Sequence, residues 1–435
     1  MKYKKRGISF GSVLMIVLTL VVAVGSVSVL GRMGNGKFSE FDAMELVSSV
    51  RSGLAATDVP VSTPAPQSTI KTTTVTLAPS QEPLYTAPQA PMKHTLTLTF
   101  GGQAAFQSDV SSSVHQAQTG QFDYVPVLQN ISDQVYANLN IAMLSNIIGE
   151  ANGQYADIQT VPQTLDAMRT LGIDHILLNH AHILDKGEQG LVQTAAAIEQ
   201  SGMYAAGVQN FDENGLANLI AVNGIHVALL GYAENVSNKT RENMQSGGRL
   251  AVLDVQAAKR DIEAVRKQGA DLVVLSLWWG TADATAVTER QRDTARQLCS
   301  AGADVIIGYG ADAVLPVEWM DAVTDRGEVR RALVAYSMGT LLSEKRDARA
   351  QVSGMLLNMR ISVDAINDHI TFDAVTYTPT YIWKQEVGGS VQFRVINSSK
   401  QAPEMMSDKQ REIMGRAYTL IEETMDGSPA VRRAE

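Results

Sequence analysis

The sequence predicts a layered α/β domain that follows an N-terminal transmembrane helix and a disordered stalk. Three observations support this organisation. A run of 25 uncharged residues, 7–31, follows a basic N-terminus. Seven of the thirteen prolines then lie between Pro60 and Pro91. From His94 onward, apolar strand-like runs alternate with helical segments, which is the pattern of a βαβ-type fold.

Residues 1–31 read as a cytoplasmic basic flank and a membrane anchor. As a helix, residues 7–31 would span roughly 37 Å, enough to cross a bilayer. Three lysines and an arginine at positions 2–6 should keep this end in the cytoplasm, which makes the rest of the chain extracellular. A cleaved signal peptide is the alternative, but the run is long for one and lacks a clear Ala-x-Ala site. We therefore expect a single-pass protein of the cell membrane with a signal-anchor.

Residues 32–93 have the composition of a stalk. The prolines alternate with Ser, Thr, Ala and Gln, and such a segment cannot bury enough apolar surface to fold. Proline also favours extended, semi-rigid conformations. Within this segment, Ser39–Leu54 has the spacing of a short amphipathic helix. It would be either a self-association element or an isolated surface helix.

Residues 94–400 form the predicted globular domain. Its first strand is Thr95–Phe100, where apolar and polar residues alternate. Further apolar strands are expected at Ile173–Leu178, His226–Tyr232, Leu272–Trp278, Val305–Ile307 and Leu333–Tyr336. Helices are expected between them at Gln163–Leu171, Gly190–Ser201, Val255–Gln268 and Glu289–Ala301. This alternation predicts parallel strands covered by helices.

The C-terminal part has a different pattern. Met355–Val363, His369–Thr376 and Val391–Val395 read as strands without long helices between them, so an antiparallel portion should close the domain. A last helix lies within residues 401–435. Ser407 begins a capping box with Gln410, and Gly427 and Pro429 end the helical spacing.

Composition and motifs exclude several classes of protein. The net charge of -9 argues against a nucleic-acid partner. A single cysteine, Cys299, excludes an intramolecular disulfide and a cysteine-based zinc cluster, and its apolar setting predicts a core position. The chain has no Gly-x-Ser-x-Gly elbow, Walker A loop or dinucleotide-binding glycine motif.

The segment Gly172–Leu191 is the strongest candidate for a functional site. A buried strand runs into a loop that carries His180, His182 and Asp185, and His175 lies in the strand itself. Strand ends in α/β enzymes commonly carry metal ligands of these types. Asp185, followed by Lys186 and a glycine, has the alternative role of turning the chain before the next helix.

Three longer phrases identify a family resemblance. They are residues 171–208 (LGIDHILLNHAHILDKG and its following helix), residues 296–319 (RQLCSAGADVIIGYGADAVLPVEW) and residues 334–342 (VAYSMGTLL). In this order they resemble the CapA-type domain of poly-γ-glutamate capsule biosynthesis proteins, over about Thr95 to Ser343. That family is related to the calcineurin-like metallophosphoesterases. The resemblance implies a four-layer αββα sandwich and an ancestral site for two divalent metals.

Most positions of that metal site depart from the family pattern. The family's Gly-Asp is Gly101-Gly102 here, its Asn-Leu-Glu is Asn138-Leu139-Asn140, and its Asn-Asn-His retains only the histidine, His182. The histidine of His-Trp-Gly is replaced by Trp278. Other replaced positions are His180, Ala181, Gly310, Asp312 and Thr340. We expect Trp278 either to fill the vacated metal volume or to form a stacking platform for a polymer or sugar.

The resemblance leaves two functional hypotheses. In the first, the chain is a pseudoenzyme without a cofactor, which binds or scaffolds during synthesis, export or attachment of poly-γ-glutamate or another envelope polymer. Its partners would be that polymer or capsule-synthesis proteins. In the second, a hydrolase retains one weakly held divalent ion (Mn, Mg or Zn), with Asn138, His182 and Asp312 as ligands and Asp185 as a fourth.

Overall fold

The computed structural model describes residues 93–149, 158–208, 219–244, 249–282, 284–323, 327, 329–364, 369–428 and 430–434. The predicted anchor, stalk and Ser39–Leu54 helix lie outside these ranges. None of the helices within the ranges is both long and apolar enough to cross a membrane.

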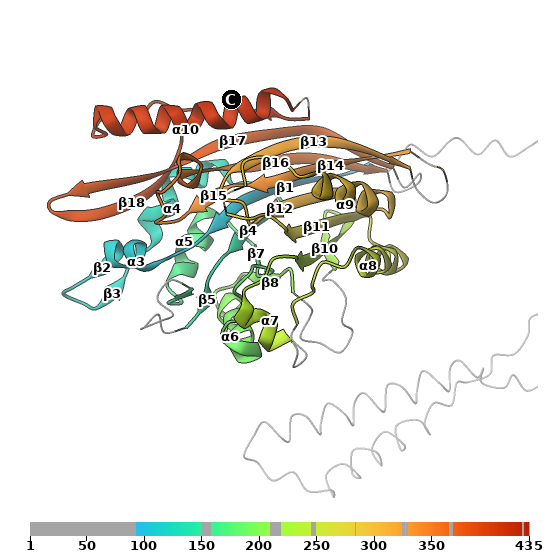
Figure 1. Cartoon of the computed structure of the whole chain (residues 1–435), viewed down its shortest axis with the longest axis horizontal. Coiled ribbons are helices and arrows are strands. Elements are labelled where there is room, and N and C mark those ends of the chain that lie inside the picture. The colour runs from blue at the N-terminus through green and yellow to red at the C-terminus, as the bar shows by residue number, and fades with distance from the viewer. Residues whose placement is uncertain are drawn as a thin grey trace, which may run out of the picture. The chain divides into compact units, whose positions relative to one another are not determined.

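Two mixed β-sheets form the centre of the domain (Figure 1). In the first sheet the described strands follow the order β18 (Ser390–Asn397), β17 (His369–Val387), β16 (Ser353–Asp364), β1 (Lys93–Ala104), β4 (Leu139–Leu144), β7 (His175–Leu177) and β8 (Tyr204–Ala206), with β15 (Thr340–Leu342) beside β1 and β19 (Arg432–Arg433) beside β17. In the second sheet the order is β13 (Val314–Val323), β14 (Val329–Met338), β12 (Val305–Tyr309), β11 (Leu272–Trp278), β10 (Ile225–Ala233) and β9 (Leu219–Val222). Each sheet has a parallel part and an antiparallel part, which confirms the predicted α/β class.

Side chains from both sheets meet in a shared central core. Leu98 and Ile141 from the first sheet pack in the same cluster as Val274 and Ile307 from the second, and all four are fully buried. They alternate with outward-facing residues because successive side chains of a strand point to opposite faces. The two sheets therefore pack face to face.

Helices cover the outer face of each sheet. The described helices α4 (Val125–Leu128), α5 (Thr164–Leu171) and α6 (Gly187–Gln200) pack on the first sheet, and α8 (Val255–Lys267) and α9 (Glu289–Ser300) pack on the second (Figure 1). Cys299, on the inner face of α9, is fully buried, as predicted. The layers therefore follow the order helix, sheet, sheet, helix.

Helix α10 (Asp408–Asp426) packs on the domain itself. Ser407 and Gln410 form the predicted capping box at its start. Met414 and Ala417 contact the face formed by β17 and β18, while Ile421 and Met425 enter the core between the sheets. In Figure 1 the helix runs across the top of the molecule, next to β17 and β13. Residues beyond position 400 therefore contribute to the core of the domain.

Candidate functional site

A buried amide joins the carboxyl ends of parallel strands in the two sheets. Asn179 lies two residues after the end of β7 and is fully buried. Its Nδ2 donates to the carbonyl oxygens of Tyr232 in β10 and Ser276 in β11, each at 3.0 Å, and its Oδ1 accepts from the Ser276 hydroxyl at 3.0 Å. Asn179 was not among the residues that the sequence singled out. It fixes the two sheets together at the edge where a site would lie.

His180 is buried next to Asn179 and does not line a cleft. It is fully buried, and its Nδ1 accepts from the backbone N–H of His182 at 3.2 Å. The proton of the neutral ring therefore lies on Nε2, which has no hydrogen-bond partner. Burial, with the neighbouring His182, lowers the pKa of His180 to about 3. The edge of the ring faces Trp278, with the ring centroids 6.2 Å apart. His180 is thus a neutral core residue at neutral pH.

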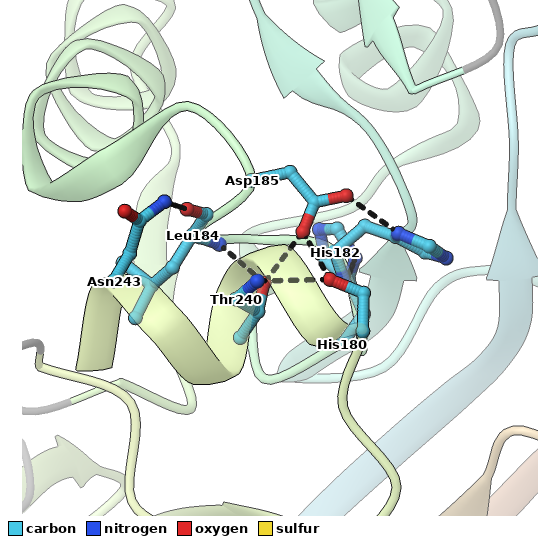
Figure 2. Close-up of polar contacts among 7 residues, drawn as sticks. His180, His182, Leu184, Asp185, Thr240 and Asn243 are labelled. Atoms are coloured by element: carbon cyan, nitrogen blue, oxygen red, sulfur yellow. Dashed lines mark hydrogen bonds and ion pairs between the residues drawn. The ribbon is translucent and has the colours of Figure 1, made fainter. Parts of the chain in front are cut away.

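Asp185 uses both carboxylate oxygens to hold the loop (Figure 2). Its Oδ2 accepts from His182 Nδ1 at 2.7 Å, and its Oδ1 accepts from the hydroxyls of Ser237 and Thr240, the latter at 2.8 Å. Burial alone would raise the pKa of Asp185, but these hydrogen bonds outweigh it and hold the pKa below its usual value. The His182 side chain remains 47% exposed. It is therefore the part of this cluster that solvent can reach.

Helix α7 (Asn238–Met244) is held against the same loop by further hydrogen bonds. The backbone N–H of Leu184 donates to Thr240 Oγ1 at 3.2 Å, and Asn243 Nδ2 donates to the Leu184 carbonyl at 2.5 Å. Figure 2 shows these contacts beside the Asp185 carboxylate. The loop residues between His180 and Lys186 consequently serve as the docking surface for α7.

Two positions where the resemblance places lost ligands are unfavourable for a side chain. A Cβ atom on Gly102 would lie 2.8 Å from the Gly339 carbonyl oxygen and 3.0 Å from the Leu341 nitrogen. Gly310 has a φ of 96°, and a Cβ there would lie 3.2 Å from Trp278 Cε2. At both positions the neighbours include backbone atoms, which cannot move aside as the end of a flexible side chain can.

Trp278 lies at the carboxyl end of β11. It is partly buried, packs against both the central core and the core beneath α5 and α6, and meets the His180 ring. The next residue, Trp279, is buried and donates from Nε1 to the Tyr336 carbonyl at 3.0 Å. The contacts of Trp278 are those of a space-filling side chain.

Asp312 lies at the same edge but serves a different set of contacts. It is buried, its Oδ1 accepts from Gln103 Nε2 at 3.0 Å, and its Oδ2 accepts from Gln351 Nε2 at 3.2 Å. Its backbone carbonyl accepts from the Thr340 hydroxyl at 3.1 Å. The carboxylate thus connects the ends of β1 and β12 to the segment that precedes β16.

Asn138 lies at the opposite end of the sheet, which corrects its assignment as a site residue. It precedes β4, and its Oδ1 accepts from the backbone N–H and the hydroxyl of Thr97 at 3.0 and 2.9 Å. Since β4 runs parallel to β1 and β7, its carboxyl end is followed by Asn146 instead. Asn146 is fully buried, and its Oδ1 accepts from the Phe106 N–H at 2.7 Å.

Comparison with known proteins gives the family. The model of the family described as "Bacterial capsule synthesis protein PGA_cap" matches residues 97–345, more than half of the chain. The chain belongs to this family. It is 25% identical over 309 residues to the capsule biosynthesis protein CapA of Bacillus anthracis, covering 67% of this chain and 71% of that protein. It is 24% identical over 302 residues to the PGA biosynthesis protein CapA of Bacillus subtilis (strain 168), covering 64% and 77%.

One similar solved structure is the calcineurin-like phosphoesterase YfkN from Bacillus subtilis. The TM-score is 0.38 at 13% sequence identity, and the alignment covers 77% of this chain and 98% of that chain.

In this PGA_cap chain the candidate ligands do not form a metal site. Asn138 is at the far end of the sheet from His182, and the carboxylates of Asp185 and Asp312 accept from separate sets of protein donors. Among the described residues, no three His, Cys, Asp or Glu side chains come together as metal ligands. Asn138 therefore cannot share an ion with His182, and the residues present do not fit a two-metal centre.

Proposed function

We propose that this PGA_cap chain takes part in making, exporting or attaching poly-γ-glutamate or another envelope polymer, and that it does so by binding or scaffolding rather than by catalysis. The family match and the names of both CapA relatives support the process. The packing at Gly102 supports the non-catalytic role, because backbone atoms close the position where the family resemblance places a metal-binding carboxylate.

The proposed setting is the cell membrane, with the domain on the outer side. The uncharged run at residues 7–31 and the basic residues before it support this proposal. A reporter enzyme that works only outside the cytoplasm, fused after residue 434, tests the orientation. Activity of that fusion, lost when residues 7–31 are deleted, is the expected result.

Genetic complementation tests the proposed role. The gene is deleted in its host, and polymer on the cell surface is measured after return of the wild-type chain, the His182→Ala variant or the Asp166→Ala control. A binding or scaffolding protein should restore polymer equally in all three cases, because no chemical step depends on His182. Loss of polymer specifically with His182→Ala, at normal protein level, would contradict the proposal.

A direct assay addresses catalysis. The full chain, purified in detergent, is incubated with a phosphodiester substrate and Mn²⁺. We expect no turnover above that of the His182→Ala variant. Robust metal-dependent turnover that disappears in this variant would instead establish a phosphoesterase.

A further inference from the structure

Arg346 carries a guanidinium group that the described part of the protein does not neutralise. The residue lies in the segment between β15 and β16. Its Nε and Nη2 atoms are buried and have no hydrogen-bond partner, and no described carboxylate forms an ion pair with it. Burial lowers the pKa of Arg346 below its usual value. The side chain is therefore a cation in an environment that does not favour its charge.

Three other partly buried arginines pair with carboxylates. Arg266 and Arg330 both contact the buried carboxylate of Asp304, and Arg292 contacts Glu318. Burial of an unpaired charge costs free energy, and removal of water from the guanidinium is compensated only when a carboxylate or another acceptor is supplied. Arg346 differs from these three arginines because its acceptor is not among the described residues.

The surroundings of Arg346 compensate its charge only in part. The guanidinium lies over the ring of Phe393, 5.7 Å from the centroid, and Lys384 Nζ lies 5.1 Å from the same centroid. A cation over a ring gains some electrostatic energy, but the ring carries no net charge. Asp109 pairs with Lys384 at 2.9 Å. Of the two cations beside the Phe393 ring, Lys384 therefore has a carboxylate partner, whereas Arg346 has none among the described residues.

We propose that Arg346 binds a carboxylate group of the acidic polymer on which the chain acts, a proposal that rests on the function proposed above. A planar guanidinium pairs with a carboxylate through two parallel hydrogen bonds, which a lysine cannot reproduce. Arg346 is only partly buried as a residue, but its Nε and Nη2 atoms are not exposed, so a ligand from solvent reaches them only if the side chain shifts outward. Phe393 and Lys384, which lie opposite each other on β18 and β17, place the site on the β17–β18 hairpin.

Binding of a γ-linked glutamate decamer to the full chain tests this site. Affinity is measured for the wild type, Arg346→Gln, Arg346→Lys and the control Lys345→Gln, which removes one positive charge from the adjacent, exposed residue. We expect at least a tenfold loss with Arg346→Gln, a smaller loss with Arg346→Lys and less than a twofold change with Lys345→Gln. The decamer should also raise the Tm of the wild type but not that of Arg346→Gln.

Several results would overturn the assignment. Equal affinity of the wild type and Arg346→Gln would do so, as would the absence of decamer binding to the wild type. Tighter binding of a polyphosphate of matched charge would identify phosphate as the ligand class instead. If Arg346→Gln does not fold, Arg346→Lys decides, since unchanged affinity there excludes recognition by the guanidinium. Polymer production in the complementation experiment is a separate readout, so failure at Arg346 is distinguishable from failure of the proposed function.

Discussion

The imidazole of His182 and the carboxylate of Asp185 lie 2.7 Å apart between Nδ1 and Oδ2. An ionised carboxylate only accepts hydrogen bonds, so the histidine donates. The other oxygen of Asp185 accepts from Ser237 and Thr240, which begin helix α7. A pair that resembles part of a metal site in sequence therefore holds a helix in place.

Replacement of Asp185 should destabilise the fold. Asp185→Asn weakens three hydrogen bonds to a largely buried carboxylate, and we expect a loss of about 1.5–3 kcal/mol in the free energy of unfolding. Urea denaturation measures it. Asp166→Asn is the matched control, since the Asp166 pair with Arg169 is exposed and should contribute less than about 0.5 kcal/mol. Equal effects of the two variants would mean that the hydrogen bonds from Asp185 to the start of α7 contribute little to stability.

The same carboxylate should make stability depend on acid. Because hydrogen bonds lower the pKa of Asp185 in the folded state, its stabilising effect is complete above the unfolded pKa of 3.8 and is lost as pH falls through the lower folded value. Unfolding measured from pH 6 to pH 2.5 should therefore lose stability more steeply in the wild type than in Asp185→Asn. Parallel curves would show that the folded pKa is not lowered.

Burial of His180 should also make stability depend on pH, over a range that begins at a higher pH than the range for Asp185. Its pKa is about 3 in the folded protein and 6.5 as a free side chain, so the unfolded state binds a proton first as the pH falls. Full stability is present above pH 6.5, and from there toward pH 3 we expect a loss of up to about 1.4 kcal/mol per pH unit. His180→Gln should flatten this slope in thermal unfolding. His226→Gln, at an exposed histidine, should leave it unchanged.

Return of the lost carboxylate at position 102 should disrupt packing without creating a metal site. The Cβ of Gly102→Asp would meet the Gly339 carbonyl oxygen at 2.8 Å, and we expect a cost of about 3 kcal/mol. Mn²⁺ should not raise the Tm of this variant. Gly415→Ala in α10, where no atom lies near the new Cβ, should instead stabilise by about 0.5–1 kcal/mol. A stable Gly102→Asp protein that binds Mn²⁺ would show that position 102 can still accommodate a metal-binding carboxylate.

The two roles considered for Trp278 predict different results. As a space-filling residue, Trp278→Ala should lose about 3 kcal/mol of stability and leave the affinity for a glutamate polymer unchanged. As a stacking platform it would lose affinity at nearly constant stability. Denaturation and polymer binding are measured on the same protein. Tyr204→Ala removes an aromatic side chain that is 61% exposed and serves as the control for stability.

Local sequence pattern was sufficient for many of the longer elements of the described domain. The run Leu272–Trp278 is β11, and the helix expected at Gln163–Leu171 is α5 at Thr164–Leu171. Two of the strands that were not predicted, β4 and β13, were missed for local reasons. Asn140 interrupts the apolar pattern of β4 and is tolerated because its Nδ2 donates to Asp174 at 3.0 Å, while β13 contains a proline. The error at Asn138 follows from the first of these omissions.

The candidate site depended on contacts that no local pattern reports. Asp185 meets Ser237 and Thr240, 52 and 55 positions later in the chain, and Gly102 is closed by the backbone of Gly339. Both contacts arise from the way distant strands pair. The sequence could indicate that ligand residues were replaced. It could not show that backbone atoms of other strands occupy the space at those positions, because that depends on the register in which the strands pair.

The position of β1 has a consequence for where this protein can be divided. Its antiparallel partner is β16, with Leu96 opposite Ile361 and Leu98 opposite Met359, whereas the family match ends at residue 345. A fragment that stops there would turn a central strand into an exposed apolar edge, which is a template for aggregation. The region that the family model matches is therefore shorter than the unit that folds, and β1 needs a partner synthesised some 260 residues after it.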